Sequence, residues 1–152
     1  GSVRRAFPEA VLQRIRQAIV ESEATHSGEI RFAVEAALPM SYLLRDAPAR
    51  ERALMMFAKL RVWDTEHNNG VLIYVALADH QIEIVADRGV APQVSVEEWN
   101  NVAAAMRDAF RARSFEAGAI VAVQAVGALL ARHFPLAAGE RNPNAAIRIK
   151  LG

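Results

Sequence analysis

The segment from Val71 to Leu77 is the feature that most constrains the fold of this chain. Seven consecutive apolar residues follow the turn-forming triplet Asn68-Asn69-Gly70, with no alternation of polar and apolar side chains. A short apolar run bounded by turn residues is typical of a strand that is buried on both faces. Such a strand needs packed layers on both sides of its sheet, so the sequence predicts helices covering both faces.

Two further strands are predicted beside this segment. Residues 29–37 and 81–87 alternate apolar and polar side chains, which is the period of a half-buried strand. A helical segment connects residues 29–37 to residues 71–77, so these two strands should be parallel. The short Ala78-Asp79-His80 turn predicts that residues 81–87 pair antiparallel with residues 71–77.

Apolar residues spaced by three and four predict four helices, over residues 8–24, 49–60, 95–113 and 114–133. Ser95 and Glu98 have the spacing of a capping box. The uncharged run from Ala117 to Ala131 is shorter than the roughly twenty residues of a spanning helix, and we expect it to be a buried helix whose Ile120, Val123 and Leu130 lie in the core. Residues 39–48 are predicted to be a loop, and Ile147 and Ile149 could add a short edge strand. The predicted fold class is α/β: a three-layer α/β/α sandwich with a small mixed β-sheet flanked by about four helices.

The chain of 152 residues has the commonest size for one domain. We expect residues 8–135 to form that domain and residues 136–152 to be a C-terminal tail. Residues 1–7 are interpreted as a lead that starts with Gly1-Ser2, a pair that resembles the scar of tag cleavage. The default expectation for location is the cytoplasm, with a leader or anchor before Gly1 as the alternative.

Composition excludes several classes of function. Eighteen basic and seventeen acidic residues leave a net charge of +1, so non-specific electrostatic binding to nucleic acid is not expected. The absence of cysteine excludes thiol catalysis and cysteine-ligated metals. The chain has no Gly-rich dinucleotide motif, Walker loop or Gly-x-Ser-x-Gly elbow, so no nucleotide cofactor is expected. Its histidines lack metal-ligand spacing and are predicted to lie at the surface or at helix ends: His26, His67, His80 and His133.

The predicted topology brings several polar segments to one edge of the sheet. The starts of the two parallel strands and the end of the third strand should meet there, with residues 26–29, 64–69 and 87–88. Hard cations such as Ca²⁺ or Mg²⁺ prefer carboxylate, amide and carbonyl oxygens, so this edge is predicted to hold them in preference to Zn²⁺. Asp87 ranks first because it directly follows a strand. The candidate metal ligands are Asp87, Glu29, Asp64, Glu66 and Asn69.

Two alternatives stay open for the same edge. With Arg88, it could bind an anion in place of a cation. The simpler interpretation is that polar residues are usual in loops, that the asparagines stabilise a tight turn, and that Glu29 or Asp87 pairs with Arg88.

Several short motifs, in order along residues 8–135, resemble the TPM domain family in its short bacterial variant. They are Ser27-Gly28-Glu29-Ile30, Asn69-Gly70-Val71-Leu72-Ile73-Tyr74-Val75, Ala86-Asp87-Arg88-Gly89-Val90, Phe115-Glu116-Ala117-Gly118-Ala119 and His133-Phe134-Pro135. The chain departs from the family pattern at Asn68, where the family usually has arginine, and at Ala86 and Val90, where it has glycine and isoleucine. The loss of the arginine weakens the anion interpretation.

The resemblance implies an α/β/α sandwich, divalent-cation binding in some members, acid phosphatase activity in plastid members and links to membrane-protein maintenance. One hypothesis is therefore a non-catalytic module that binds a divalent cation or a protein, with a membrane-associated complex as partner and no membrane insertion by this chain. The alternative is a metal-assisted acid phosphatase acting on phosphomonoesters, in which a cation polarises the phosphoryl group and Asp87 or Asp64 holds it. The binding hypothesis leads, because the sequence identifies no nucleophile with an adjacent base.

Overall fold

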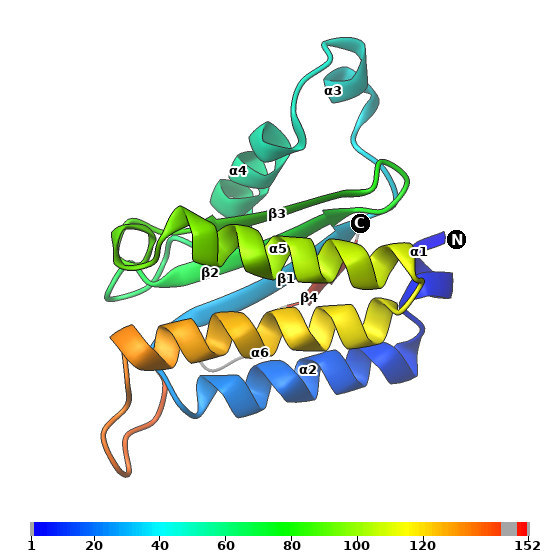
Figure 1. The fold of residues 1–152 in the computed structure, drawn as a ribbon. Helices are drawn as coiled ribbons and strands as arrows, with labels where there is room; N and C mark the ends of the chain where they lie inside the picture. Colours follow the sequence, from blue (N-terminus) through cyan, green and yellow to red (C-terminus); the bar gives the residue numbers. More distant parts are fainter. Residues whose placement is uncertain (1, 144–148, 152) are drawn as a thin grey trace.

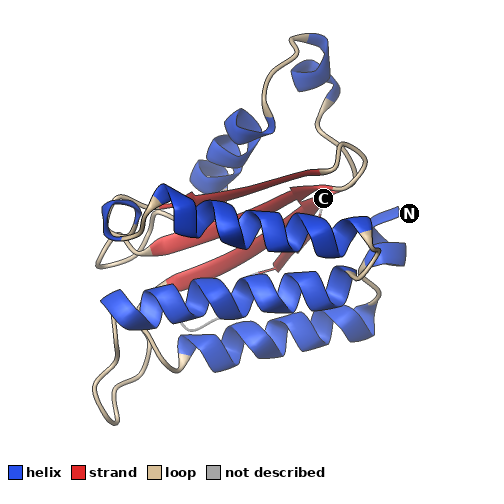
Figure 2. Cartoon of the chain, viewed as in Figure 1, coloured by secondary structure: helices blue, strands red, loops and turns tan. Residues whose placement is uncertain are grey.

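The computed structural model describes residues 2–143 and 149–151. Within these residues, a four-stranded mixed sheet has the order β3-β2-β1-β4 and carries helices on both faces (Figures 1 and 2). The strands are β1 (Glu29–Glu35), β2 (Gly70–Ala76), β3 (Gln81–Ala86) and β4 (Ile149–Leu151). β1 is parallel to β2 and to β4, whereas β3 is antiparallel to β2. The predicted α/β sandwich and the directions of the first three strands are confirmed.

The central strand β2 is buried along its whole length. Val71, Ile73 and Val75 belong to the core on one face of the sheet. Leu72 and Tyr74 belong to a second core on the other face. The unbroken apolar run is therefore explained, because each successive side chain of β2 enters one of two cores.

Three helices pack side by side over the first face of the sheet: α2 (Glu9–Glu23), α5 (Val96–Arg111) and α6 (Phe115–His133) (Figure 1). A short 3-10 helix, η1 (Ala91–Gln93), precedes α5. At the start of α5, the Ser95 side chain accepts from the Glu98 backbone N–H, and the Glu98 carboxylate accepts from the Ser95 N–H. The predicted capping box is thus confirmed.

The second face is covered over β2 and β3 by α4 (Ala49–Lys59). Before it, the chain forms a short helix, α3 (Met40–Leu44), inside the segment that was predicted to be a loop. That prediction was wrong for these five residues. Pro39 provides an extended residue before the first helical turn, and the buried Tyr42 ring anchors that turn on the second core.

A partly buried charged network joins α4 to the sheet. Arg52 donates two hydrogen bonds of 2.8 Å to the two carboxylate oxygens of Glu35, and the Tyr74 hydroxyl donates one of 2.7 Å to the same carboxylate. Burial opposes ionisation of Glu35, but the hydrogen bonds from Arg52 and Tyr74 outweigh it and hold the pKa of Glu35 below its ordinary value. Burial and the neighbouring Glu35 carboxylate raise the pKa of Tyr74. The phenol therefore stays protonated as a donor.

Phe7, which follows the N-terminal helix, is part of the packed structure. Residues 1–7 were interpreted as a lead, yet α1 (Ser2–Ala6) is helical and Phe7 is fully buried. The Phe7 ring contacts Phe32, Phe110 and Phe115 with ring centroids 5.7 to 6.0 Å apart. The Phe7 side chain therefore belongs to the core on the first face of the sheet, with Val71 and Ile73.

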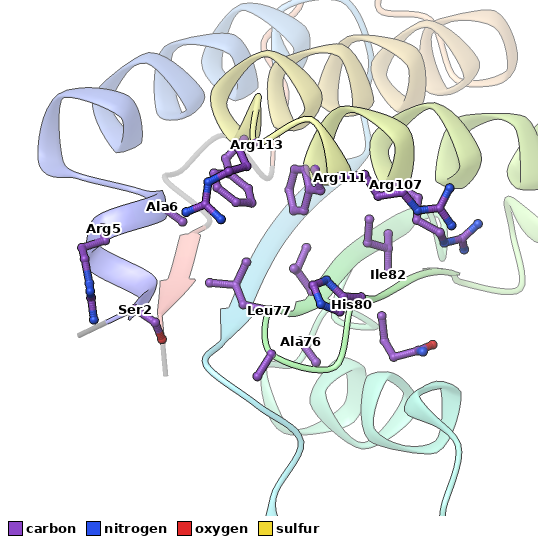
Figure 3. Close-up of a pocket in the computed structure, with 15 residues that line it drawn as sticks. Ser2, Arg5, Ala6, Ala76, Leu77, His80, Ile82, Arg107, Arg111 and Arg113 are labelled. Carbon is purple, nitrogen blue, oxygen red and sulfur yellow. The ribbon is translucent and has the colours of Figure 1, made fainter.

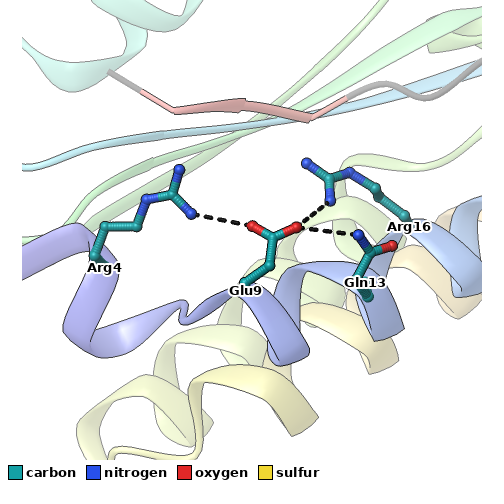
Figure 4. A network of polar contacts seen from close by, with 4 residues as sticks. All are labelled: Arg4, Glu9, Gln13 and Arg16. Atoms are coloured by element: carbon teal, nitrogen blue, oxygen red, sulfur yellow. Dashed lines mark hydrogen bonds and ion pairs between the residues drawn. The ribbon is translucent and has the colours of Figure 1, made fainter.

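An exposed network links α1 to the start of α2. Hydrogen bonds from Arg16, Gln13 and Arg4 to the Glu9 carboxylate lower the pKa of Glu9 (Figure 4). Because these groups are in water, we expect the network to orient α1 rather than to add much stability.

The last helix covers the first face of the sheet, and the C-terminal segment adds the edge strand β4. Val123 and Leu130 of α6 are fully buried as predicted, but Ile120 is only partly buried against the core. Among the described residues, α6 is also long and apolar enough to cross a membrane by length and composition. Ile149 lies in the edge strand β4, and Ile147, which was predicted with it, lies outside the described residues.

We expect Leu130→Ala to lower the free energy of unfolding by about 2 to 5 kcal/mol, because it leaves a cavity in the main core. Val121→Ala, on the same helix at a side chain that is 52% exposed, should change stability by less than about 0.5 kcal/mol. Urea unfolding measures both values. An unchanged midpoint for Leu130→Ala would place this face of α6 against a partner or a membrane.

Candidate functional site

The predicted edge is formed where β1 and β2 begin and β3 ends. Glu29 pairs with Gly70 in the parallel register, and the Asp87 backbone N–H donates to the Gly70 carbonyl at 2.9 Å. Glu29, Gly70 and Asp87 therefore lie in one row across three neighbouring strands. A Cβ atom at Gly70 would lie 2.1 Å from the Val62 carbonyl oxygen, so only glycine fits between the two acidic residues.

Asn69 lies buried immediately before this row. Its backbone N–H donates to the Thr65 hydroxyl at 2.9 Å, its carbonyl accepts from the Glu29 N–H at 3.4 Å, and its side-chain amide donates to the Ser27 hydroxyl at 3.1 Å. These bonds fix the orientation of the side chain. Its Oδ1 atom is buried without a hydrogen-bond partner among the described residues.

Asp87 has a similar unsatisfied oxygen. Its Oδ1 atom accepts from the Arg88 backbone N–H at 2.7 Å, whereas its buried Oδ2 atom has no hydrogen-bond partner in the described part of the chain. Buried polar atoms in proteins are nearly always paired with protein, water or an ion. Asn69 and Asp87 therefore each present an oxygen acceptor that the described residues leave unsatisfied at this edge.

The other predicted ligands have different surroundings. Glu29 is 6% exposed, and its carboxylate lies 3.8 Å from the Arg31 guanidinium. Asp64 forms an exposed ion pair with Arg61 at 3.1 Å, and Glu66 is exposed in the same loop. Among the described residues, no group of three or more His, Asp or Glu side chains could hold a metal ion. A cation here would need amide or main-chain oxygens beside the carboxylates.

The loop before β1 is ordered by hydrogen bonds from distant parts of the chain. The Ser27 N–H donates to the Phe134 carbonyl at 3.0 Å, and His26 forms a β-bridge with Pro135. The Asn142 side-chain amide donates to the carbonyls of His26 and Gly28 at 2.7 and 2.8 Å. The end of α6 and the tail thus hold the loop that leads to Glu29.

Comparison with known proteins gives the family of this chain. The family model for the TPM domain matches residues 4–129. The chain belongs to the TPM domain family. It is also similar to the NMR structure of the BA42 protein from the psychrophilic bacterium Bizionia argentinensis, at 29% sequence identity and a TM-score of 0.81, covering 94% of this chain and 93% of that one. No curated protein matches the chain.

His26 of this TPM domain lies in surroundings that differ from those predicted by its sequence. It was expected at the surface or a helix end, but it is fully buried. The Gly28 N–H donates to its Nδ1 atom at 3.0 Å, so the ring proton resides on Nε2, which lies 3.0 Å from the Ser22 hydroxyl. Burial lowers the pKa of His26 to about 4. Both ring nitrogens are thus occupied, and the imidazole is a neutral structural group.

The sequence contained little indication that His26 and Asn142 take part in the structure of this edge. The position of His26 directly before the Ser27-Gly28-Glu29 motif was the only hint for it. Asn142 gave none, because it lies in a segment rich in Ala, Pro, Asn and Gly that has no periodicity.

We predict that this TPM domain loses stability in acid through His26. The imidazole of His26 has a pKa of about 4 in the folded protein, against 6.5 for an unperturbed histidine, so between these pH values only the unfolded chain takes up the proton. The free energy of unfolding should fall as pH falls from about 6.5 to 4, by about 3 kcal/mol in total.

In His26→Gln this contribution is absent, and the pH dependence of unfolding should be correspondingly shallower. NMR titration of the His26 ring should give its midpoint near pH 4. Identical pH dependence in the two proteins would contradict the prediction.

Proposed function

We propose that this TPM domain is a non-catalytic module that binds a divalent cation at the edge formed by Glu29, Asn69 and Asp87. The observation that carries the proposal is the pair of buried oxygens, Asn69 Oδ1 and Asp87 Oδ2, without hydrogen-bond partners among the described residues. Amide and carboxylate oxygens suit Ca²⁺ or Mg²⁺ better than Zn²⁺. A cation within reach of both oxygens would satisfy them and lower the cost of burying the Asp87 charge.

The biological role we propose is that of an interaction module linked to membrane-protein maintenance, with a membrane-associated complex as partner. Family membership suggests this role. Val123 and Leu130 of α6 are fully buried in the core, which supports docking by the folded domain without membrane insertion by this chain.

A binding role is favoured over catalysis by the state of the neighbouring side chains. The Ser27 hydroxyl accepts a hydrogen bond from the Asn69 amide. The adjacent His26 uses both ring nitrogens in hydrogen bonds, and burial lowers its pKa to about 4. Ser27 and His26 therefore do not form the nucleophile and base that a covalent mechanism needs. The alternative, a metal-assisted acid phosphatase, would have to use a cation-bound water as nucleophile.

The decisive measurement is a titration with Ca²⁺, Mg²⁺ and Zn²⁺ followed by amide NMR shifts. We expect Ca²⁺ or Mg²⁺ to shift residues 27–29, 69–70 and 87–89. Asp87→Asn keeps the shape and removes one charge, so affinity should fall about tenfold or more, since even outer-shell partners of a metal site change affinity by roughly 10- to 100-fold. Asp108→Asn, at an exposed position on α5, is the matched control and should bind like the wild type.

Shifts confined to residues 39–48 or to the turn at residues 79–80 would show that the predicted edge is wrong. No shift at millimolar cation would remove the metal hypothesis and leave an interaction module without a metal. Cation-dependent hydrolysis of a phosphomonoester that is lost in Asp87→Asn would favour the phosphatase alternative.

A further inference from the structure

A cavity of about 560 Å³ lies at the opposite end of the sheet from Asp87. It is formed by the end of β2, the turn into β3, the last turn of α5 and the N-terminal helix α1 (Figure 3). Its volume is in the range of small-molecule sites. Ligands of open α/β sheets commonly bind outside the carboxyl ends of the parallel strands, which is where this cavity lies.

The polar lining of the cavity is basic. Arg107, Arg111 and Arg113 lie along one side and His80 faces them from the β2–β3 turn, while Arg5 comes from α1 (Figure 3). Among the described residues that line the cavity, none is acidic. Low-dielectric walls focus the potential of like charges, so an anion would be concentrated here even though the net charge of the chain is only +1.

These arginines are weakly compensated. Arg111 forms an ion pair with Asp108 at 3.4 Å, in which both side chains are more than 70% exposed, and such a pair contributes little to stability. Arg113 lies over the Phe115 ring, 5.7 Å from its centroid. Arg107 has no acidic partner in the described part of the chain. The charges therefore remain available to a ligand.

The remaining wall is apolar. Leu77 and Ile82 line the cavity from the sheet, and Phe110 and Phe115 line it from the helices. The two phenylalanine rings pack edge to face with centroids 5.1 Å apart. A ligand that fits must therefore combine an anionic group with an apolar body. Basic residues at the end of α5 also suit the helix dipole, but this does not explain His80 or the aromatic wall.

We propose that this cavity binds a small amphipathic organic anion. Arg107, Arg111 and Arg113 hold its phosphate or phosphonate-type group, and Phe110, Phe115 and Leu77 contact its aliphatic or aromatic body. The site is separate from the cation edge and does not depend on the proposed cation binding.

The test uses three probes. Benzylphosphonate carries both the anionic group and the apolar ring, and a phosphatase cannot hydrolyse it. Inorganic phosphate carries the anionic group alone, and benzyl alcohol carries the ring alone. Amide NMR shifts of residues 77–82 and 110–115 report binding. We expect benzylphosphonate to bind at least about tenfold more tightly than either partial probe, and its affinity to fall as salt rises because charge is being screened.

Arg107→Gln and Arg113→Gln should each weaken benzylphosphonate binding by about tenfold or more, as expected for loss of a charge-assisted hydrogen bond. Arg141→Gln, at an exposed arginine that does not line the cavity, is the matched control. Melting temperatures establish that each variant is folded.

Three results would overturn the proposal. Equal affinity for inorganic phosphate and benzylphosphonate would reduce the site to a simple anion site. Equal affinity for benzyl alcohol would show that the arginines contribute nothing. Weakening by Arg88→Gln, with no effect of Arg107→Gln, would place the anion at the opposite edge of the sheet.

Discussion

The burial of β2 on both faces is the constraint on which the rest of the structure depends. Its side chains enter two separate cores, so the sheet has to be covered twice. Three helices supply one layer, whereas α4 supplies the other over β2 and β3. The phenol of Tyr74 points into the second layer and needs a polar partner there, which the Glu35 carboxylate provides while Arg52 holds that carboxylate in place. Burial of one strand thus accounts for both the layers and the charged network between them.

The candidate cation edge also depends on hydrogen bonds to residues near the C-terminal end of the chain. The loop at residues 26–28 receives hydrogen bonds from Asn142 and donates one to the Phe134 carbonyl. His26 satisfies its two ring nitrogens within the same region. These bonds hold the backbone that positions Ser27 and Glu29. The geometry of the edge is therefore a property of the whole domain, although its acidic and amide residues come from short local motifs.

The two ends of the sheet differ in charge. Glu29 and Asp87 lie where the parallel strands begin, while Arg107, Arg111 and Arg113 surround the cavity where β2 ends. The net charge of +1 is a sum over the whole chain and does not reveal this separation of charge. If both proposals hold, one small domain would bind a cation at one end and an organic anion at the other, with the apolar core between them.

Local patterns in the sequence determined the three long strands, their directions, the helices over both faces and the capping box at Ser95. Each of these depends on periodicity or on residues a few positions apart, which the sequence displays directly. Family membership was also evident from short motifs, and so was the assembly of Glu29, Asn69 and Asp87 at one edge, since strand direction alone places them there.

Only the tertiary structure decided the burial of His26, the contribution of Phe7 to the core, the partial exposure of Ile120 and the convergence of arginines from two helices on one cavity. The short helix at residues 40–44 likewise depends on Tyr42 reaching the second core. A pattern indicates which face a residue occupies, but its burial depends on which distant segments cover that face. Those segments are brought together by long-range packing, so no local pattern could have predicted them.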